Sequence, residues 1–258
     1  MKRNRLKQLL AQGKPAVGTW LTLGSIPAAR HLARSGFDWL CVDCEHSSVT
    51  VETATVMLGA IADAGCVPLA RVPSNRHDHI KRMLDGGAFG VVVPMVNHAE
   101  ESKHAIDACF YPPRGNRSVG GGMHALNFQT TPASYFANAD EEIAVILQCE
   151  HIDAVRNFDA VYGAAPGVDV VFVGPNDLAA SLRNPQGIPP SSTAFDEALA
   201  EVRAGCTRLG IAPGIHTFSA EEAKRRLAEG WRFVAVGSDA QLLTDGAADL
   251  IFGLAPGR

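Results

Sequence analysis

The stretch VDVVFVGPNDL, residues 168–178, shows a pattern that recurs along the chain. An apolar, β-branched run, typical of a buried strand, ends in a group of polar and turn-forming residues. Similar runs alternate with longer stretches rich in Ala and Leu that have helical periodicity. The predicted strands are 16–21, 37–43, 67–72, 89–95, 143–149, 168–173, 211–216 and 232–236. The predicted helices lie near 26–35, 51–64, 77–86, 98–109, 151–163, 192–209, 219–229 and 239–252.

Eight strands that are each followed by a helix predict an α/β fold with parallel strands buried on both faces. About 250 residues is the usual size of a (β/α)₈ TIM barrel, and no shift in composition divides residues 1–258, so we expect a single domain. A doubly wound open sheet is the alternative, although the chain lacks that fold's usual phosphate-binding fingerprints. The segment 111–142, rich in Gly and Pro, is predicted to be irregular and either functional or mobile.

The composition narrows the classes of partner. Lys and Arg number 23 against 27 Asp and Glu, a net charge of −4, and basic residues cluster only at positions 2–7. A nucleic-acid-binding protein normally concentrates positive charge on one face, so we expect no nucleic-acid partner. No apolar run reaches the roughly 18 to 20 residues of a membrane helix. Six scattered cysteines in apolar runs suggest reduced thiols and a cytoplasmic protein.

Polar residues gather where several predicted strands end. TIM-barrel enzymes carry their chemistry at the carboxyl ends of the strands, so these positions are the candidate active site. The candidates are Asp43, Cys44, Glu45, His46, Arg71, Gln148, Glu150, Gly174, Pro175, Asn176, Asp177, His216 and residues 237–239. Taken singly, several have a structural explanation: Arg71 could form a packing ion pair, and His216 is expected to support other residues rather than catalyse.

Glu150 and Asp177 are candidate metal ligands. They end neighbouring strands, so both carboxylates should be buried near the barrel mouth, where they would repel each other unless a cation or protons intervene. A pair of oxygen ligands selects a hard ion such as Mg²⁺ or Mn²⁺. Gln148 lies two residues before Glu150, on the same face of the strand. Asp177 could instead be a helix N-cap.

His46 is the candidate general base. An acid beside a histidine fixes its tautomer and supports its protonated form, a role that Asp43 could fill. Other chemistries fit less well. Cys41 and Cys44 lack a second cysteine pair for zinc and should face opposite ways. No G-x-S-x-G motif is present, and no lysine follows a strand, which disfavours serine hydrolysis and Schiff-base catalysis.

Seven motifs together resemble the HpcH/HpaI aldolases, which are metal-dependent class II pyruvate aldolases. They are DWLCVDCEH (38–46), ARVP (70–73), VVVPMV (91–96), YPPRGNR (111–117), LQCE (147–150), FVGPNDL (172–178) and VAVGSD (234–239). The resemblance implies a lyase that reversibly cleaves a 4-hydroxy-2-oxo acid into pyruvate and an aldehyde through a metal-bound pyruvate enolate. The implied cofactor is a divalent cation, Mg²⁺ or Mn²⁺, with Co²⁺ as a further option.

The resemblance also assigns roles to residues. Glu150 and Asp177 would bind the metal, His46 with Asp43 would catalyse proton transfer, and Arg71 would orient pyruvate. Gln148 would contact the keto acid, and the turn Gly174-Pro175-Asn176, which continues into Asp177, would bind its carboxylate. The implied assembly is a homo-oligomer, hexamer or trimer, that exchanges the last helix, 240–253. Cys44, Gly121, His151 and Asn176 depart from residues common in the family, so the aldehyde component stays open.

Two other functions remain open from the sequence. The same enolate chemistry would serve an oxaloacetate decarboxylase or a citryl-type CoA-thioester lyase. A barrel that binds a keto acid and a metal without turnover is the alternative outside enzymes, although it would have no need of both His46 and Asp43.

Overall fold

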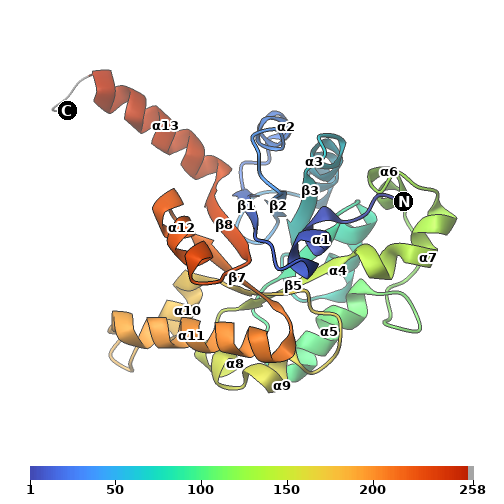
Figure 1. Ribbon diagram of the computed structural model, residues 1–258. Coiled ribbons are helices and arrows are strands. Elements are labelled where there is room, and N and C mark those ends of the chain that lie inside the picture. The colour runs from blue at the N-terminus through green and yellow to red at the C-terminus, as the bar shows by residue number, and fades with distance from the viewer. Residues whose placement is uncertain (255–258) are drawn as a thin grey trace.

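The computed structural model describes residues 1–254 and contains a closed barrel of eight parallel strands surrounded by helices (Figure 1). Consecutive strands pair in parallel, and the first also pairs with the last, which closes the barrel. The strands are β1 (Ala16–Leu21), β2 (Trp39–Asp43), β3 (Val67–Arg71), β4 (Gly90–Val93), β5 (Ala144–Cys149), β6 (Val170–Val173), β7 (Ala212–Thr217) and β8 (Phe233–Ser238). The predicted TIM barrel is confirmed, and the open sheet is excluded.

The helices cover the outside of the barrel and connect its strands. They are α1 (Arg5–Ala11), α2 (Ile26–Leu32), α3 (Val51–Asp63), α4 (His77–Asp85), α5 (Ala99–Cys109), α6 (Met123–Asn127), α7 (Pro132–Glu142), α8 (Ile152–Arg156), α9 (Phe158–Tyr162), α10 (Pro175–Ser181), α11 (Ser192–Leu209), α12 (Ala220–Ala228) and α13 (Asp239–Leu254). The helix predicted over 151–163 is two helices, because Asn157 leaves the helical conformation between them.

The sequence predicted that the segment 111–142 is irregular. This prediction is wrong for part of the segment, because it contains α6 and α7. Thr131 caps α7 through its side chain, and Pro132 occupies the first helical position, where a missing N–H costs nothing. Arg117 anchors the preceding loop: its guanidinium is buried and donates hydrogen bonds to Asp85 and to the Tyr135 hydroxyl. The Gly- and Pro-rich loop therefore packs onto the barrel through specific polar contacts.

A column of aromatic rings fills the barrel interior. Trp39 stacks on Phe233 with 4.2 Å between ring centroids, and Phe233 meets the edge of Phe172. Phe172 in turn contacts Trp20 at 5.7 Å, near the carboxyl ends of the strands. Gly18 leaves the space that the Trp39 indole occupies, since a Cβ at Gly18 would overlap that ring. The interior packing thus leads directly to the floor of the cavity described below.

The last helix, α13, projects away from the barrel (Figure 1). Among its residues, Asp239 alone is buried. Its exposed apolar side chains are Leu242, Leu243, Leu250, Ile251, Phe252 and Leu254.

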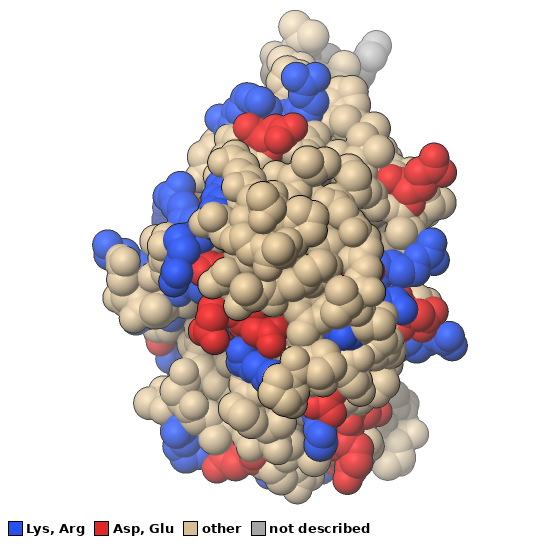
Figure 2. Space-filling model, turned by 90° about the vertical axis from the view of Figure 1, so that its right-hand side faces the viewer, with Lys and Arg blue, Asp and Glu red and all other residues tan. Residues whose placement is uncertain are grey.

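On the face drawn in Figure 2, acidic and basic side chains alternate around an uncharged area. None of the helices within residues 1–254 is both long and apolar enough to cross a membrane.

Candidate active site

One cavity of about 350 Å³ opens at the carboxyl ends of the strands. It is lined by all nine residues to which the sequence assigned a function: Asp43, His46, Arg71, Gln148, Glu150, Gly174, Pro175, Asn176 and Asp177. The cavity also contains Trp20, Phe172, His216 and Phe218. Residues from β1, β2, β3, β5, β6, β7 and β8 therefore meet in one place, as the strand-end argument required.

Arg71, the last residue of β3, is held by two carboxylates. Its Nε donates to Asp43 Oδ1 at 2.8 Å and its Nη2 to Asp43 Oδ2 at 2.6 Å, a bidentate pair. Its Nη1 lies 3.2 Å from Glu45 Oε2. Burial opposes ionisation of Asp43, but the hydrogen bonds and charge of Arg71 lower the pKa of Asp43 below its usual value. The guanidinium is thus fixed in orientation and stays charged.

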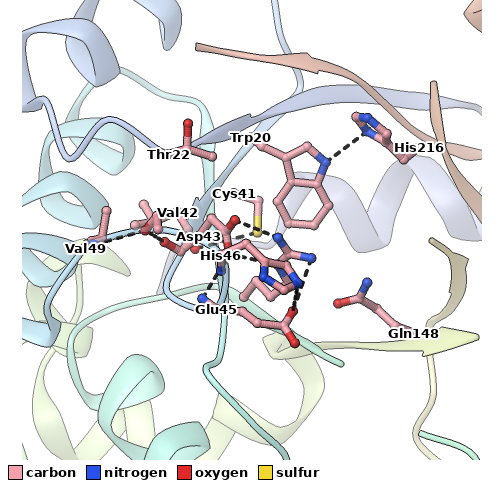
Figure 3. Close-up of polar contacts among 12 residues, drawn as sticks. Trp20, Thr22, Cys41, Val42, Asp43, Glu45, His46, Val49, Gln148 and His216 are labelled. Atoms are coloured by element: carbon pink, nitrogen blue, oxygen red, sulfur yellow. Dashed lines mark hydrogen bonds and ion pairs between the residues drawn. The ribbon is translucent and has the colours of Figure 1, made fainter. Parts of the chain in front are cut away.

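The expected pairing of Asp43 with the His46 imidazole is wrong. Both oxygens of Asp43 are taken by Arg71, and Oδ1 accepts further hydrogen bonds from the backbone N–H groups of Glu45 and His46. The His46 side chain is 70% exposed, and its Nε2 lies 3.9 Å from Glu45 Oε2 (Figure 3). Asp43 therefore positions the loop that carries His46, and Glu45 is the acid nearest the imidazole.

Glu150 is buried at the end of β5 and has fixed partners for both oxygens. Gln148 Nε2 donates to its Oε1 at 2.7 Å, and the backbone N–H of Met95 donates to its Oε2 at 3.0 Å. Gly174 lies against this carboxylate, where a Cβ would collide with Oε1. Burial raises the pKa of Glu150 to about 7; the Met95 N–H opposes the shift, and the charges of Glu45 and Asp177 add to it.

Asp177 differs from its expected position. It is the third residue of α10 and is exposed, whereas the sequence argument placed it in a buried site. The alternative that it caps the helix is also wrong, because Gly174 is the N-cap residue. Pro175 occupies the first helical position and has no N–H to offer a ligand, so the backbone donors at this turn come from the residues after it.

The donor chemistry fits a hard divalent cation. Burial raises the pKa of Glu150 and of Glu45, and the negative charge of Asp177 adds to both shifts, a repulsion that a cation would relieve. Gln148 Oε1 is a buried oxygen without a hydrogen-bond partner. Within residues 1–254, no three His, Cys, Asp or Glu side chains converge as a ready metal site. Mg²⁺ commonly uses only one or two protein carboxylates and takes its other ligands from water and substrate.

Sequence reasoning did not identify the roles that three residues have in this site. Glu45 binds Arg71, and its spacing of two residues from Asp43 was the available signal. Trp20 covers the Arg71 guanidinium, with 4.5 Å from Cζ to the ring centroid. His216, expected only to support other residues, lines the cavity itself. Trp20 lies within an apolar strand and could not be distinguished from a core residue by the sequence pattern alone.

The comparisons with known proteins agree on the family. The model of the HpcH/HpaI aldolase/citrate lyase family matches residues 16–246. The chain belongs to this family. It is 38% identical, over 96% of its length and 93% of the relative's, to a protein of Salmonella heidelberg (strain SL476) named 4-hydroxy-2-oxo-heptane-1,7-dioate aldolase. Family membership and this aldolase relative identify a carbon–carbon lyase.

Solved structures of HpcH/HpaI proteins have the same fold. A family member from Burkholderia cenocepacia J2315 superposes with a TM-score of 0.88 at 33% identity, covering 97% of this chain and 99% of that one. A protein described as Citrate Synthase SbnG superposes with a TM-score of 0.83 at 25% identity and covers 98% of both chains. The barrel therefore supports both an aldolase and a citrate synthase among its relatives.

Proposed function

We propose that this HpcH/HpaI protein reversibly cleaves a 4-hydroxy-2-oxo acid into pyruvate and an aldehyde. One observation carries the proposal: a charged arginine, fixed by Asp43 and Glu45, shares a cavity with the buried carboxylate of Glu150. Cleavage leaves a pyruvate enolate, whose negative oxygen needs positive charge that is already in place. The keto acid and the aldehyde are thus the proposed small-molecule partners.

We assign a divalent cation, Mg²⁺ or Mn²⁺, to the carboxylates of Glu150 and Asp177. When bound, such a cation supplies Lewis acidity that polarises the 2-oxo group and stabilises negative charge on its oxygen. Gln148 holds Glu150 Oε1, and the Met95 N–H holds Oε2, so the carboxylate keeps one orientation. Gly174 provides the room for it. The N–H groups of Asn176 and Asp177 are the proposed donors to the keto-acid carboxylate.

The proposed proton transfer uses His46. Its exposed imidazole can take the proton of the 4-hydroxyl group as the bond between C3 and C4 breaks, and Glu45 at 3.9 Å stabilises the resulting imidazolium. Arg71 meanwhile faces the 2-oxo oxygen, where charge develops. In the synthetic direction the enolate carbon attacks the aldehyde, and His46 returns the proton to the new hydroxyl group.

Exchange of the pyruvate methyl protons in D₂O, followed by NMR, tests the enolate step without an aldehyde. We expect exchange with Mg²⁺ or Mn²⁺ present, none after removal of metal with EDTA, and recovery when either ion is restored. Full exchange after rigorous chelation would contradict the metal assignment. No exchange in the metal-supplied protein would contradict the lyase proposal.

Three further properties belong to the same proposal. We propose that the chain is one catalytic domain, and the single closed barrel within residues 1–254 supports this. The exposed apolar side chains of α13 support a homo-oligomer, a hexamer or trimer. The six cysteines are buried and unpaired, which supports a reducing, cytoplasmic location.

A further inference from the structure

His216 lines the cavity, and one edge of its ring already accepts a hydrogen bond from the protein. The indole N–H of Trp20 donates to His216 Nδ1 at 3.1 Å (Figure 3). Phe218 packs edge-on against the imidazole, with 4.7 Å between ring centroids. Within residues 1–254, Nε2 on the opposite edge has no hydrogen-bond partner, which leaves that edge free for a ligand.

The contact with Trp20 fixes the tautomer of His216. An indole nitrogen can only donate, so Nδ1 must accept and cannot carry a proton. The neutral ring then carries its proton on Nε2. Burial, together with the charge of Arg71, lowers the pKa of His216 to about 4, so the ring stays neutral at physiological pH. His216 therefore offers the cavity an uncharged N–H donor.

The charges around the cavity argue against a second carboxylate on the substrate. Among the lining residues, Arg71 alone is Arg or Lys. Asp43 and Glu45 take three of its N–H groups, and the others serve the 2-oxo oxygen in the proposed reaction. Asp43 adds negative charge to the same cavity, and the cation proposed for Glu150 and Asp177 is committed to the keto acid. A carboxylate binds best to a cationic donor. A neutral N–H suits a hydroxyl group instead.

We propose that His216 determines which aldehyde is used, by donating its Nε2–H to a hydroxyl group on the aldehyde component. This inference rests on the proposed aldol reaction and deepens it. The protein then prefers hydroxylated aldehydes over aldehydes that end in a carboxylate. It would differ in this respect from the Salmonella relative, whose name specifies a dioate. Trp20 acts as a positioning residue that holds His216 in the donating tautomer.

Aldol synthesis from pyruvate with three aldehydes tests the proposal. Lactaldehyde and propionaldehyde share a carbon skeleton and differ by one hydroxyl group, whereas succinic semialdehyde ends in a carboxylate. We expect kcat/KM for lactaldehyde to exceed that for propionaldehyde by about tenfold, the value of one well-placed neutral hydrogen bond. Lactaldehyde should also exceed succinic semialdehyde. Because all three meet the same enolate, their ratios cancel changes in the pyruvate step.

His216→Leu should bring the lactaldehyde to propionaldehyde ratio close to one. His216→Gln, which keeps an N–H near the position of Nε2, should retain most of the ratio, and the exposed matched control His104→Leu should leave it as in the wild type. An unchanged ratio in His216→Leu, or a wild-type preference for succinic semialdehyde, would overturn the inference alone. Absence of pyruvate exchange in the wild type would overturn the proposed function and this inference with it.

Nitrogen-15 NMR of the histidines provides a readout independent of turnover. The resonances that disappear in His216→Gln identify His216. At neutral pH we expect Nδ1 to be unprotonated and Nε2 protonated in the wild type, with mixed tautomers in Trp20→Phe. A protonated Nδ1 in the wild type would overturn the proposal.

Discussion

Arg71 shows how a charged side chain can be buried and still serve a reaction. A desolvated guanidinium is costly unless its N–H groups are satisfied, and here Asp43 and Glu45 satisfy three of them. The Trp20 ring covers one face of the guanidinium. The arrangement leaves the positive charge oriented before the substrate arrives, which is the condition for efficient stabilisation of a developing oxyanion.

Arg71→Lys tests that arrangement while keeping the charge. An ammonium cannot reproduce the bidentate geometry with Asp43, so we expect kcat for cleavage to fall by about 100-fold. Lys103→Ala is the control, because Lys103 is exposed and pairs with Asp107 on the surface. Steady-state pyruvate release measures both, with circular dichroism to check folding. Similar losses in the two variants would mean that the catalytic site lies elsewhere.

Spacing along the strands predicted much of the site, because a two-residue period places side chains on one face. Gln148 and Glu150 do contact each other, as this period requires. The same rule could not assign partners. Asp43 could reach either Arg71 or His46, and the sequence contains no information on which geometry allows two parallel hydrogen bonds. Asp177 was misplaced because its exposure depends on where α10 starts.

The aromatic column links the strands of the barrel to the cavity above them. Trp39 on β2, Phe233 on β8 and Phe172 on β6 come from distant parts of the chain and pack in one interior stack. The stack ends at Trp20, which contacts both Arg71 and His216. Changes in core packing can therefore shift the groups that line the cavity.

Gly18→Ala tests the packing of this column. The added Cβ would overlap the Trp39 indole and its carbonyl oxygen, so either β1 or the ring must move. Overpacking of this kind typically costs about 1–3 kcal/mol in free energy of unfolding. Urea denaturation measures the change. Gly246→Ala, at a position on α13 where a Cβ meets no neighbour, is the control. Equal stability of Gly18→Ala and the wild type would contradict the packing described here.

Prediction from the sequence found the eight strands and most helices, but it missed α6, α7 and α10 and merged α8 with α9. The eight strands are mostly apolar runs that the barrel buries, so they can be recognised from the sequence alone. The helices α6, α8, α9 and α10 have five to seven residues, too few for a period of 3.6 to be recognised. Their ends depend on tertiary contacts that the sequence does not reveal.

At the scale of the whole molecule, six exposed apolar side chains gather on one helix, α13. Leu243 and Leu250 on α13 are 65% and 70% exposed, and the helix projects away from the barrel (Figure 1). Exposed apolar groups gathered in this way mark a protein contact. The eight strand–helix repeats made the barrel predictable, but which surface a partner covers depends on a second chain.

Sedimentation measurements test this surface. We expect the wild type to sediment as a multiple of its 27.3 kDa subunit, consistent with a hexamer or trimer. Leu250→Glu should shift the population toward smaller species, because a charge would have to be buried in the contact. Arg156→Glu, on the exposed side of α8, serves as the charge control. A monomeric wild type would contradict the oligomer proposal.

The most direct measurement is diffraction from crystals soaked with Mn²⁺ and pyruvate, with data collected at a wavelength where manganese scatters anomalously. We predict one strong anomalous peak between the carboxylates of Glu150 and Asp177, with pyruvate beside it and within reach of Arg71. A map without a peak between those two carboxylates, or with manganese only elsewhere, would contradict the account.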